Sequence, residues 1–186
     1  LIDHIRRVDP AAVIILDAKR ADIGKTNEGY ANFVYDRMRA DAVTLNPYFG
    51  EKALAPFLQR PDKGSIILCR TSNPGASEFQ NAMVQVTSDD RRAFGRDAQV
   101  THIPLYQLVA HRVANWQTSG LIGVVVGATA PDELRIVRSI LPQTLILIPG
   151  VGTQGGDLET AVRFGIGPNK NGPMLINAGS KVLYAS

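Results

Sequence analysis

Three charged residues follow one another closely after a short apolar stretch near the start of the chain. Asp17 and Lys19 are two residues apart, and Asp22 comes three residues later, in the pattern Asp-x-Lys-x-x-Asp. If the apolar stretch is a strand, Asp17 and Lys19 point to the same side of it. A lysine placed between carboxylates keeps its charge and can donate a proton to a bound molecule. A salt bridge at a strand end, with no catalytic role, is the alternative interpretation.

A second group of residues has the composition of an anion-binding loop. After another apolar run the sequence continues as Gly150-Val-Gly152-Thr-Gln154-Gly155-Gly156. Glycines leave backbone N–H groups free to face an anion, and a helix is predicted to begin directly afterwards. The spacing matches neither the Walker loop nor the dinucleotide-binding fingerprint. A tight glycine turn without a ligand is the alternative.

Other polar residues also follow apolar runs, but their types are less specific. Thr71 and Ser72 could donate hydrogen bonds to a ligand, and they are equally common as helix caps and turn residues. The three histidines, His4, His102 and His111, have no neighbouring cysteine or aspartate pattern and no serine motif. Metal chemistry and Ser-His-Asp chemistry are therefore disfavoured.

The elements that must position these residues alternate regularly along the chain. Short apolar runs predict six buried strands, at 13–16, 42–45, 65–69, 121–126, 145–148 and 174–177. Helical spacing predicts helices over 29–40, 51–59, 105–119, 157–164 and one that begins at Pro131. Residues 76–101 have weak patterning and are predicted to be an elaborated loop inserted in the domain.

This alternation predicts an α/β fold with a parallel sheet covered by helices. A doubly wound open sheet and a (β/α)8 barrel both fit the order of elements. Polar or glycine-rich segments follow nearly every predicted strand, which favours the barrel, because its site is assembled from loops all around the ring. An open sheet would concentrate its chemistry at one switch point.

Composition narrows the class of protein. With 186 residues, 45% of them hydrophobic and 20% charged, the chain is typical of one globular domain, which we place at 1–186. A net charge of +3 on scattered basic residues predicts no nucleic-acid surface. No run reaches the roughly 18 apolar residues of a membrane span. Cys69 is the only cysteine, which excludes an internal disulfide and fits a reducing cytoplasm.

Taken together, the motifs resemble the orotidine 5'-phosphate decarboxylase family. The resemblance rests on DAKRADIG, DAVTLNPYFG, LCRTSNPG, PDEL and IPGVGTQGGD, which occur in the family's order along nearly the whole chain. TSNPG and the 76–101 insertion resemble the longer, second-type branch. The resemblance implies a (β/α)8 TIM barrel and a lyase of de novo pyrimidine biosynthesis, which converts orotidine 5'-phosphate to UMP. It also implies a cytoplasmic homodimer, with no metal and no organic cofactor.

The family's site residues carry over by position. Lys19 would deliver a proton to C6 of the pyrimidine, and Asp17 would crowd the substrate carboxylate and hold Lys19. Asp22 would serve the site of the partner subunit, with Thr26 near the ribose. Substrate-binding positions would be Thr71 and Ser72 on the pyrimidine edge, and Gln154 with Gly150, Gly152, Gly155 and Gly156 on the phosphate.

Two departures from the family pattern lie near the ends of the chain. In the family, the first lysine of the charged array belongs to the strand before the one that carries Asp17, and we expect that strand and its lysine to be missing from this sequence. Ser180 stands where a phosphate-binding arginine is expected, and Lys181 beside it could act as a point charge. Barrels typically need about 250 residues. We therefore expect strands 3–8 of eight, in a single incomplete domain with an open or gapped barrel.

Two other functions fit the same residues. A related sugar-phosphate decarboxylase or synthase uses the Asp-x-Lys-x-x-Asp pattern together with magnesium. A non-catalytic protein that binds a nucleotide phosphate would account for Ser180 and for the missing upstream lysine.

Overall fold

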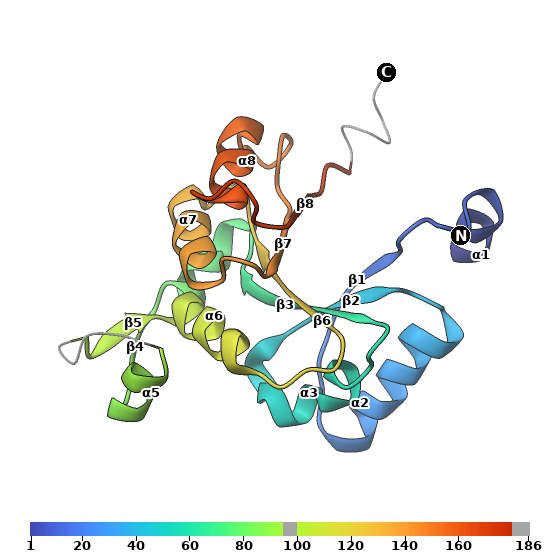
Figure 1. Ribbon diagram of the computed structural model, residues 1–186, viewed down its shortest axis with the longest axis horizontal. Coiled ribbons are helices and arrows are strands. Elements are labelled where there is room, and N and C mark those ends of the chain that lie inside the picture. Colours follow the sequence, from blue (N-terminus) through green and yellow to red (C-terminus); the bar gives the residue numbers. More distant parts are fainter. Residues whose placement is uncertain (95–99, 180–186) are drawn as a thin grey trace. The chain divides into compact units, whose positions relative to one another are not determined.

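The computed structural model describes residues 1–94 and 100–179, which form two compact units (Figure 1). The first unit comprises residues 1–68 and 116–123, and the second comprises residues 69–115 and 124–186. The first unit contains helix α1 (Ile2–Val8), strand β1 (Ile15–Arg20), helix α2 (Gly24–Ala31), the π-helical turn η1 (Asn32–Arg37), strand β2 (Ala42–Leu45), the 3-10 turn η2 (Pro47–Phe49) and helix α3 (Gly50–Leu58).

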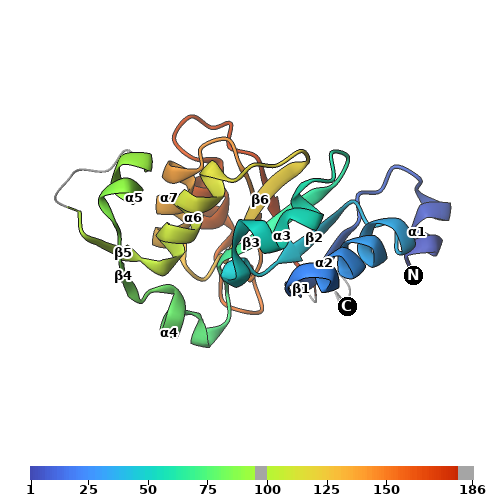
Figure 2. The ribbon, with the colours of Figure 1, turned by 90° about the horizontal axis from the view of Figure 1, so that it is seen from below.

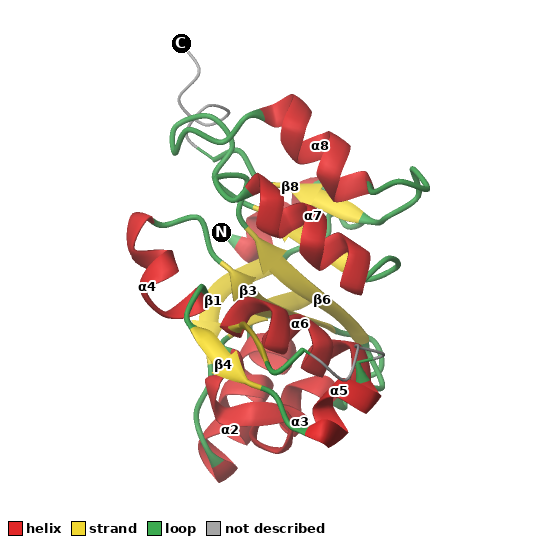
Figure 3. Ribbon diagram, turned by 90° about the vertical axis from the view of Figure 1, so that its left-hand side faces the viewer, coloured by secondary structure: helices red, strands yellow, loops and turns green. Residues whose placement is uncertain are grey.

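The second unit is rich in short elements before its main helices. It contains η3 (Pro74–Ala76), α4 (Ser77–Gln80), β4 (Met83–Gln85), α5 (Ser88–Ala93), β5 (His102–Pro104), α6 (Leu105–Asn115), α7 (Pro131–Ile140), β7 (Leu145–Ile148), α8 (Leu158–Ile166) and β8 (Met174–Ile176). Strands β3 (Gly64–Arg70) and β6 (Leu121–Val126) contribute residues to both units. Helices α7 and α8 lie side by side (Figure 3).

The six predicted strands are all present, in the order β1-β2-β3-β6-β7-β8. The pairs β1–β2, β2–β3 and β7–β8 are parallel, as the alternation with helices predicts. This linear order, with β1 and β8 as end strands, is that of a partial barrel. No helix among the described residues is long and apolar enough to cross a bilayer.

The predicted loop at 76–101 and the three residues that follow it contain regular structure that the sequence did not predict. Strands β4 and β5 form a separate antiparallel pair, and the short helix α5 lies between them along the chain (Figure 2). A capping box at Thr87 and Asp90 begins α5, because the side chain of each residue accepts from the backbone amide of the other. The two strands are only three residues long, which is too short for a periodic pattern to be visible in the sequence.

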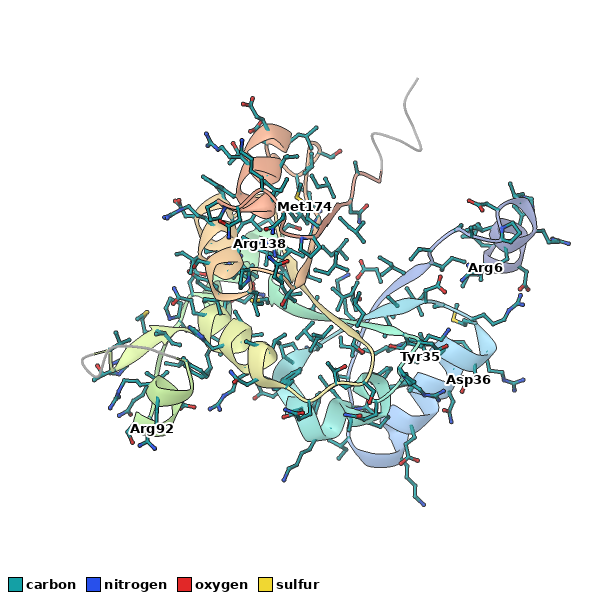
Figure 4. The ribbon with its side chains drawn as sticks, in the orientation of Figure 1. Arg6, Tyr35, Asp36, Arg92, Arg138 and Met174 are labelled. Carbon is teal, nitrogen blue, oxygen red and sulfur yellow. The ribbon has the colours of Figure 1, made fainter. Side chains whose placement is uncertain are left out.

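The core of the first unit forms between β2, β3 and the apolar face of α3. Every residue of β2 is buried, and Leu54 and Phe57 of α3 are at most 1% exposed. Tyr35 packs edge-on against Phe57, and its hydroxyl donates to the Gly64 carbonyl at 3.0 Å (Figure 4). Burial raises the pKa of Tyr35 to about 12. The Tyr35 hydroxyl therefore stays a neutral donor that ties the π-helical turn to the start of β3.

Strand β1 differs from the sequence prediction in place and in burial. It runs from Ile15 to Arg20, whereas the apolar run predicted residues 13–16. Val13 lies outside the strand and is 74% exposed. Because β1 pairs only with β2, one of its edges has no neighbouring strand among the described residues, and its residues are either partly buried or exposed.

In the second unit, a buried guanidinium joins several chain segments. Arg138 is 2% exposed, and burial lowers its pKa. No carboxylate accepts from it among the described residues. It donates instead to backbone carbonyls of Gly165 (2.6 Å), Leu141 (2.9 Å), Pro142 (3.3 Å), Thr144 (2.8 Å) and Pro173 (2.8 Å). One side chain thus satisfies the carbonyl ends of α7 and α8 and the residue before β8 (Figure 4).

Replacing this guanidinium should destabilise the protein strongly. Arg138→Met leaves several buried carbonyls without donors, so we expect a loss of about 3 kcal/mol or more in the free energy of unfolding. Arg135→Met on the same helix is the matched control, because the Arg135 side chain is 62% exposed. Its expected effect is within about 0.5 kcal/mol. Urea unfolding measures both, and equal effects of the two variants would contradict this role of Arg138.

Candidate active site

The ladder between β1 and β2 is interrupted where the charged residues lie. It is regular as far as Leu16, which pairs with Val43. It resumes only at Arg20, which pairs with Leu45. The three residues between Leu16 and Arg20 therefore lie opposite the single residue Thr44. Such bulges bend a strand and change the direction of its side chains, and they are frequent near active sites.

The backbone of Lys19 has an unusual conformation within this bulge. Its φ is 48°, in the left-handed region that non-glycine residues seldom adopt. Its N–H, displaced from the regular ladder, donates to Thr44 Oγ1 at 2.9 Å. A conformation of this kind costs on the order of 1–3 kcal/mol and persists only where surrounding contacts hold it.

The Asp17 carboxylate joins the parts of this group. Lys19 Nζ donates to Asp17 Oδ2 at 2.6 Å, and Thr44 Oγ1 donates to Asp17 Oδ1 at 2.8 Å. The Asp17 and Lys19 side chains are 56% and 52% exposed, whereas Thr44 is fully buried. A buried hydroxyl thus holds the ion pair on one side, and the exposed parts of both side chains are open to a ligand. The two side chains meet across a bulge, and not by the regular alternation assumed from their spacing.

Electrostatics keep Asp17 ionised. Partial burial by itself would raise the pKa of Asp17, but the hydrogen bonds from Lys19 and Thr44 and the charge of Lys19 outweigh it and lower the pKa. The carboxylate is therefore charged at any pH near neutrality. A negative charge at this position repels an anionic group of a bound molecule and attracts the Lys19 side chain, whose Nζ lies 2.6 Å away.

Asp22 and Thr26 lie just before and within the first turn of α2, and neither forms a hydrogen bond with the Asp17–Lys19 pair among the described residues. The Asp22 side chain accepts from the next backbone amide, that of Ile23, at 2.8 Å. No bond from Asp22 to Asp17 or Lys19 is present among the described residues. Asn27, fully buried, donates to the Asp22 carbonyl at 2.5 Å and to the Ala53 carbonyl at 2.6 Å, which anchors this loop to α3. Thr26 is exposed.

In the second unit, the loop after β3 is held by a residue that the sequence analysis did not single out. The side-chain oxygen of Gln80 accepts from the Thr71 amide at 2.8 Å, and its Nε2 donates to Thr71 Oγ1 at 2.9 Å. Thr71 Oγ1 in turn donates to Asn73 Oδ1 at 2.6 Å. Gln80 lies in the weakly patterned stretch, so no sequence signal connected it with Thr71.

Ser72 packs directly against two glycines from the loops after β6 and β7. A Cβ added to Gly127 would lie 2.7 Å from Ser72 Cα, and one added to Gly150 would lie 2.8 Å from Ser72 Cβ. The same position on Gly150 is 2.9 Å from Gln154 Oε1. Thr129 Oγ1 donates to the Ser72 carbonyl at 3.1 Å. The structure thus brings together the predicted binding residues Ser72, Gly150 and Gln154.

The glycine loop itself differs from the sequence expectation of free N–H groups. The amides of Gly152, Gly155 and Gly156 donate to carbonyls of Gly156, Gly152 and Gly150, at 3.0, 2.8 and 3.0 Å. Gly150, Gly152 and Gly155 have φ values of 94°, 84° and 89°, so glycine is needed for this turn. Three of the expected anion donors are therefore used within the loop.

The N-terminus of α8 is also occupied by the chain itself. Asp157 Oδ1 accepts from the Thr160 amide at 2.8 Å, and this hydrogen bonding lowers the pKa of Asp157. A capping carboxylate therefore lies at this helix end and uses the Thr160 amide, and the expectation that the helix end faces an anion stays a prediction. The remaining predicted positions, Ser180 and Lys181, lie outside the described residues.

Comparisons with known proteins show the family to which the chain is similar. The sequence model of the "Orotidine 5'-phosphate decarboxylase / HUMPS family" matches residues 1–186. Orotidine 5'-phosphate decarboxylase from Ralstonia nicotianae is 46% identical over 187 residues, covering 100% of this chain and 63% of the relative. The relative from Methylibium petroleiphilum is 43% identical, with 64% of its length covered. The chain thus spans slightly less than two thirds of the curated relatives it matches.

Solved structures show the same likeness. The OMP decarboxylase of Leishmania donovani superimposes with a TM-score of 0.81 and 33% identity, covering 100% of this chain and 66% of that one. The UMP synthase of the same organism gives a TM-score of 0.79 and 35% identity, covering 95% of this chain and 36% of that one. Both comparisons match the six-stranded α/β arrangement to part of a larger protein.

The packing around Ser72 gives a stability prediction. Gly150→Ala and Gly155→Ala both place a side chain on a left-handed backbone, which costs about 1 kcal/mol or more. Only Gly150→Ala also collides with Ser72, since an added Cβ on Gly155 meets nothing within 4 Å. We expect Gly150→Ala to lose a further ~1–3 kcal/mol of unfolding free energy relative to Gly155→Ala. Thermal or urea unfolding compares them, and equal losses would disprove the close packing.

Proposed function

The chain belongs to the orotidine 5'-phosphate decarboxylase / HUMPS family, and on that premise we propose that it is part of a lyase that converts orotidine 5'-phosphate to UMP. The observation that carries the proposal is the Asp17–Lys19 ion pair at 2.6 Å, on a bulge at the carboxyl end of a parallel strand and open to a ligand. In barrel enzymes, catalytic residues come from these strand ends.

The proposed reaction uses the ion pair in two steps. The bond between C6 of the pyrimidine and its carboxylate breaks, carbon dioxide leaves, and the electron pair stays on C6. Lys19 then gives a proton from Nζ to C6 and regains one from solvent. Asp17 repels the substrate carboxylate, and this repulsion ends when carbon dioxide leaves, so the carbanion-like state is favoured over the bound substrate.

The family resemblance also assigns substrate-binding residues to the second unit. Thr71 and Ser72 would bind the edge of the pyrimidine. Hydrogen bonds with Gln80 hold Thr71, and close packing against two glycines holds Ser72, so both residues would keep a fixed geometry for this contact. Gln154 would donate to the phosphate from the glycine loop. Ser180 and Lys181 would complete the phosphate contacts from the segment after β8.

We also propose a homodimer in which Asp22 and Thr26 act in the partner's site. Ile23, Tyr48 and Phe49 of the first unit are 64%, 88% and 45% exposed, although large apolar side chains are usually buried. Tyr48 and Phe49 form an edge-to-face pair with ring centres 6.0 Å apart. Exposed apolar side chains, one of them directly after Asp22 in the sequence, support contact with a second copy. The free, buried Cys69 fits a cytoplasmic location.

A sugar-phosphate decarboxylase or synthase is the second candidate, because the description of the matching family carries a second name, HUMPS, beside orotidine 5'-phosphate decarboxylase. The Asp-x-Lys-x-x-Asp pattern would then work together with magnesium. The two candidates differ in substrate and in metal dependence. Turnover of orotidine 5'-phosphate that persists in EDTA selects the first, and turnover of a sugar phosphate that EDTA abolishes selects the second.

The role of Lys19 can be tested in the protein expressed from its whole coding sequence. Lys19→Ala removes the proton donor, so we expect kcat for orotidine 5'-phosphate to fall by about 10²- to 10⁴-fold. Lys52→Ala, at an exposed position of α3, is the control and should keep full activity. Undiminished turnover in Lys19→Ala contradicts the assignment. A wild-type protein that binds UMP without any decarboxylation would indicate a non-catalytic binding protein.

Mixing two inactive variants tests the shared site. An Asp22→Ala subunit paired with a Lys19→Ala subunit forms one intact site and one doubly defective site. A symmetric dimer mixed at equal amounts should therefore recover about a quarter of wild-type activity. Co-purification through a tag on one variant confirms that subunits exchange. Exchange without recovery would show that Asp22 does not act across the interface.

A further inference from the structure

Thr44 occupies an unusual place beside the candidate catalytic pair. It lies in the middle of β2, it is fully buried, and it faces the three bulged residues of β1. Its hydroxyl accepts from the Lys19 amide at 2.9 Å and donates to Asp17 Oδ1 at 2.8 Å. The Thr44 hydroxyl therefore gives its only proton to Asp17 and accepts a hydrogen bond from Lys19, the two residues proposed to do the chemistry.

A buried threonine in a strand is ordinary, since β-branched residues fit the pleated surface. Valine would fill the same space, and it would serve equally well if packing were the only requirement. The direction of the two hydrogen bonds argues for more. Neither bond goes to the regular ladder, and both go to the segment whose backbone departs from it, including Lys19 at φ 48°.

We propose that Thr44 is a positioning residue, whose hydroxyl fixes the bulge of β1 and the orientation of the Asp17 carboxylate so that Lys19 points its ammonium at the reacting carbon. This inference rests on the proposed function of Asp17 and Lys19. Thr44 itself does not touch substrate in this proposal. It acts through the two residues it binds.

The geometry explains why a single hydroxyl has this leverage. Asp17 Oδ2 holds Lys19 Nζ at 2.6 Å, so rotation of the carboxylate would move the ammonium with it. The bond from Thr44 to the other oxygen, Oδ1, prevents that rotation. The bond from the Lys19 amide to the same hydroxyl fixes the other end of the lysine. Misplacing a catalytic group by about 1 Å can cost about 10²-fold in rate.

The substitution Thr44→Val keeps the shape and removes the hydroxyl. In the protein expressed from its whole coding sequence, we expect kcat to fall by about 10- to 100-fold. KM should change by less than about threefold, because the proposed phosphate and pyrimidine contacts lie on other residues. Thr44→Ser restores the hydroxyl and should restore kcat to within about threefold of the wild type.

A threonine elsewhere in the same unit provides the matched control. Thr118 Oγ1 lies within hydrogen-bond distance of two main-chain carbonyls, those of Leu58 at 2.9 Å and Gly120 at 3.0 Å, and its single proton can serve either one. No bond from Thr118 to Asp17 or Lys19 is present in the described part of the chain. Thr118→Val should lower stability without changing kcat. If circular dichroism shows that Thr44→Val does not fold, Thr44→Ala replaces it as the variant without a hydroxyl. Its kcat is then compared with that of Thr44→Ser, which keeps the hydroxyl.

A second measurement separates this inference from the proposed function. Carbon-detected NMR of the ligand-free protein follows the Asp17 carboxyl through a pH titration. The charged group that faces it is Lys19, and the neutral donor is Thr44. Losing that donor should raise the pKa of Asp17 in Thr44→Val and not in Thr118→Val or Thr44→Ser. A wild type without turnover would refute the proposed function and leave this titration valid. An unchanged Asp17 pKa, or an unchanged kcat in a folded Thr44→Val, would overturn the role of Thr44.

Discussion

The arrangement of the candidate site depends on the interruption of the ladder between β1 and β2. Regular parallel pairing would leave Lys19 N–H to bond with the neighbouring backbone and would place its side chain by alternation alone. The bulge removes that bond and gives Lys19 a left-handed φ, and the hydroxyl of Thr44 replaces the missing acceptor. Because the same hydroxyl also holds Asp17, the local departure from regular structure and the geometry of the ion pair have a single cause.

The second unit positions its polar groups by a different physical means. There the loops after β3, β6 and β7 approach so closely that no side chain fits between them, and Ser72 lies against Gly127 and Gly150. The side chain of Gln80 supplies the remaining bonds to Thr71. In both units a polar residue at a strand end is held by a neighbouring segment that has no reactive group of its own. Such support is what keeps a site in a fixed geometry.

Much of the fold could be predicted from local sequence, because burial on both faces makes parallel strands continuously apolar. The runs at 42–45, 121–126 and 145–148 coincide with β2, β6 and β7. The bulge in β1 could not be predicted, since register depends on a partner strand more than twenty residues away. For the same reason Thr44 was indistinguishable from an ordinary strand residue, and Gln80 from a loop residue. Residue types therefore indicated which groups could react, and pairing between segments decided how they are held.

The glycine loop shows how counting donors in a sequence differs from counting available donors in a fold. Backbone amides that are not open to water are nearly always paired, and in this ligand-free loop the amides of Gly152 and Gly156, and that of the exposed Gly155, all donate to carbonyls of the loop itself. A phosphate that bound there would exchange these bonds for charge-assisted ones, which are roughly twice as strong, and would gain only the difference. A side chain beside the loop gives up no such backbone bond. Recognition of the phosphate in the proposed function therefore falls first to Gln154, and the glycines serve chiefly to bring Gln154 and Ser72 to the same place.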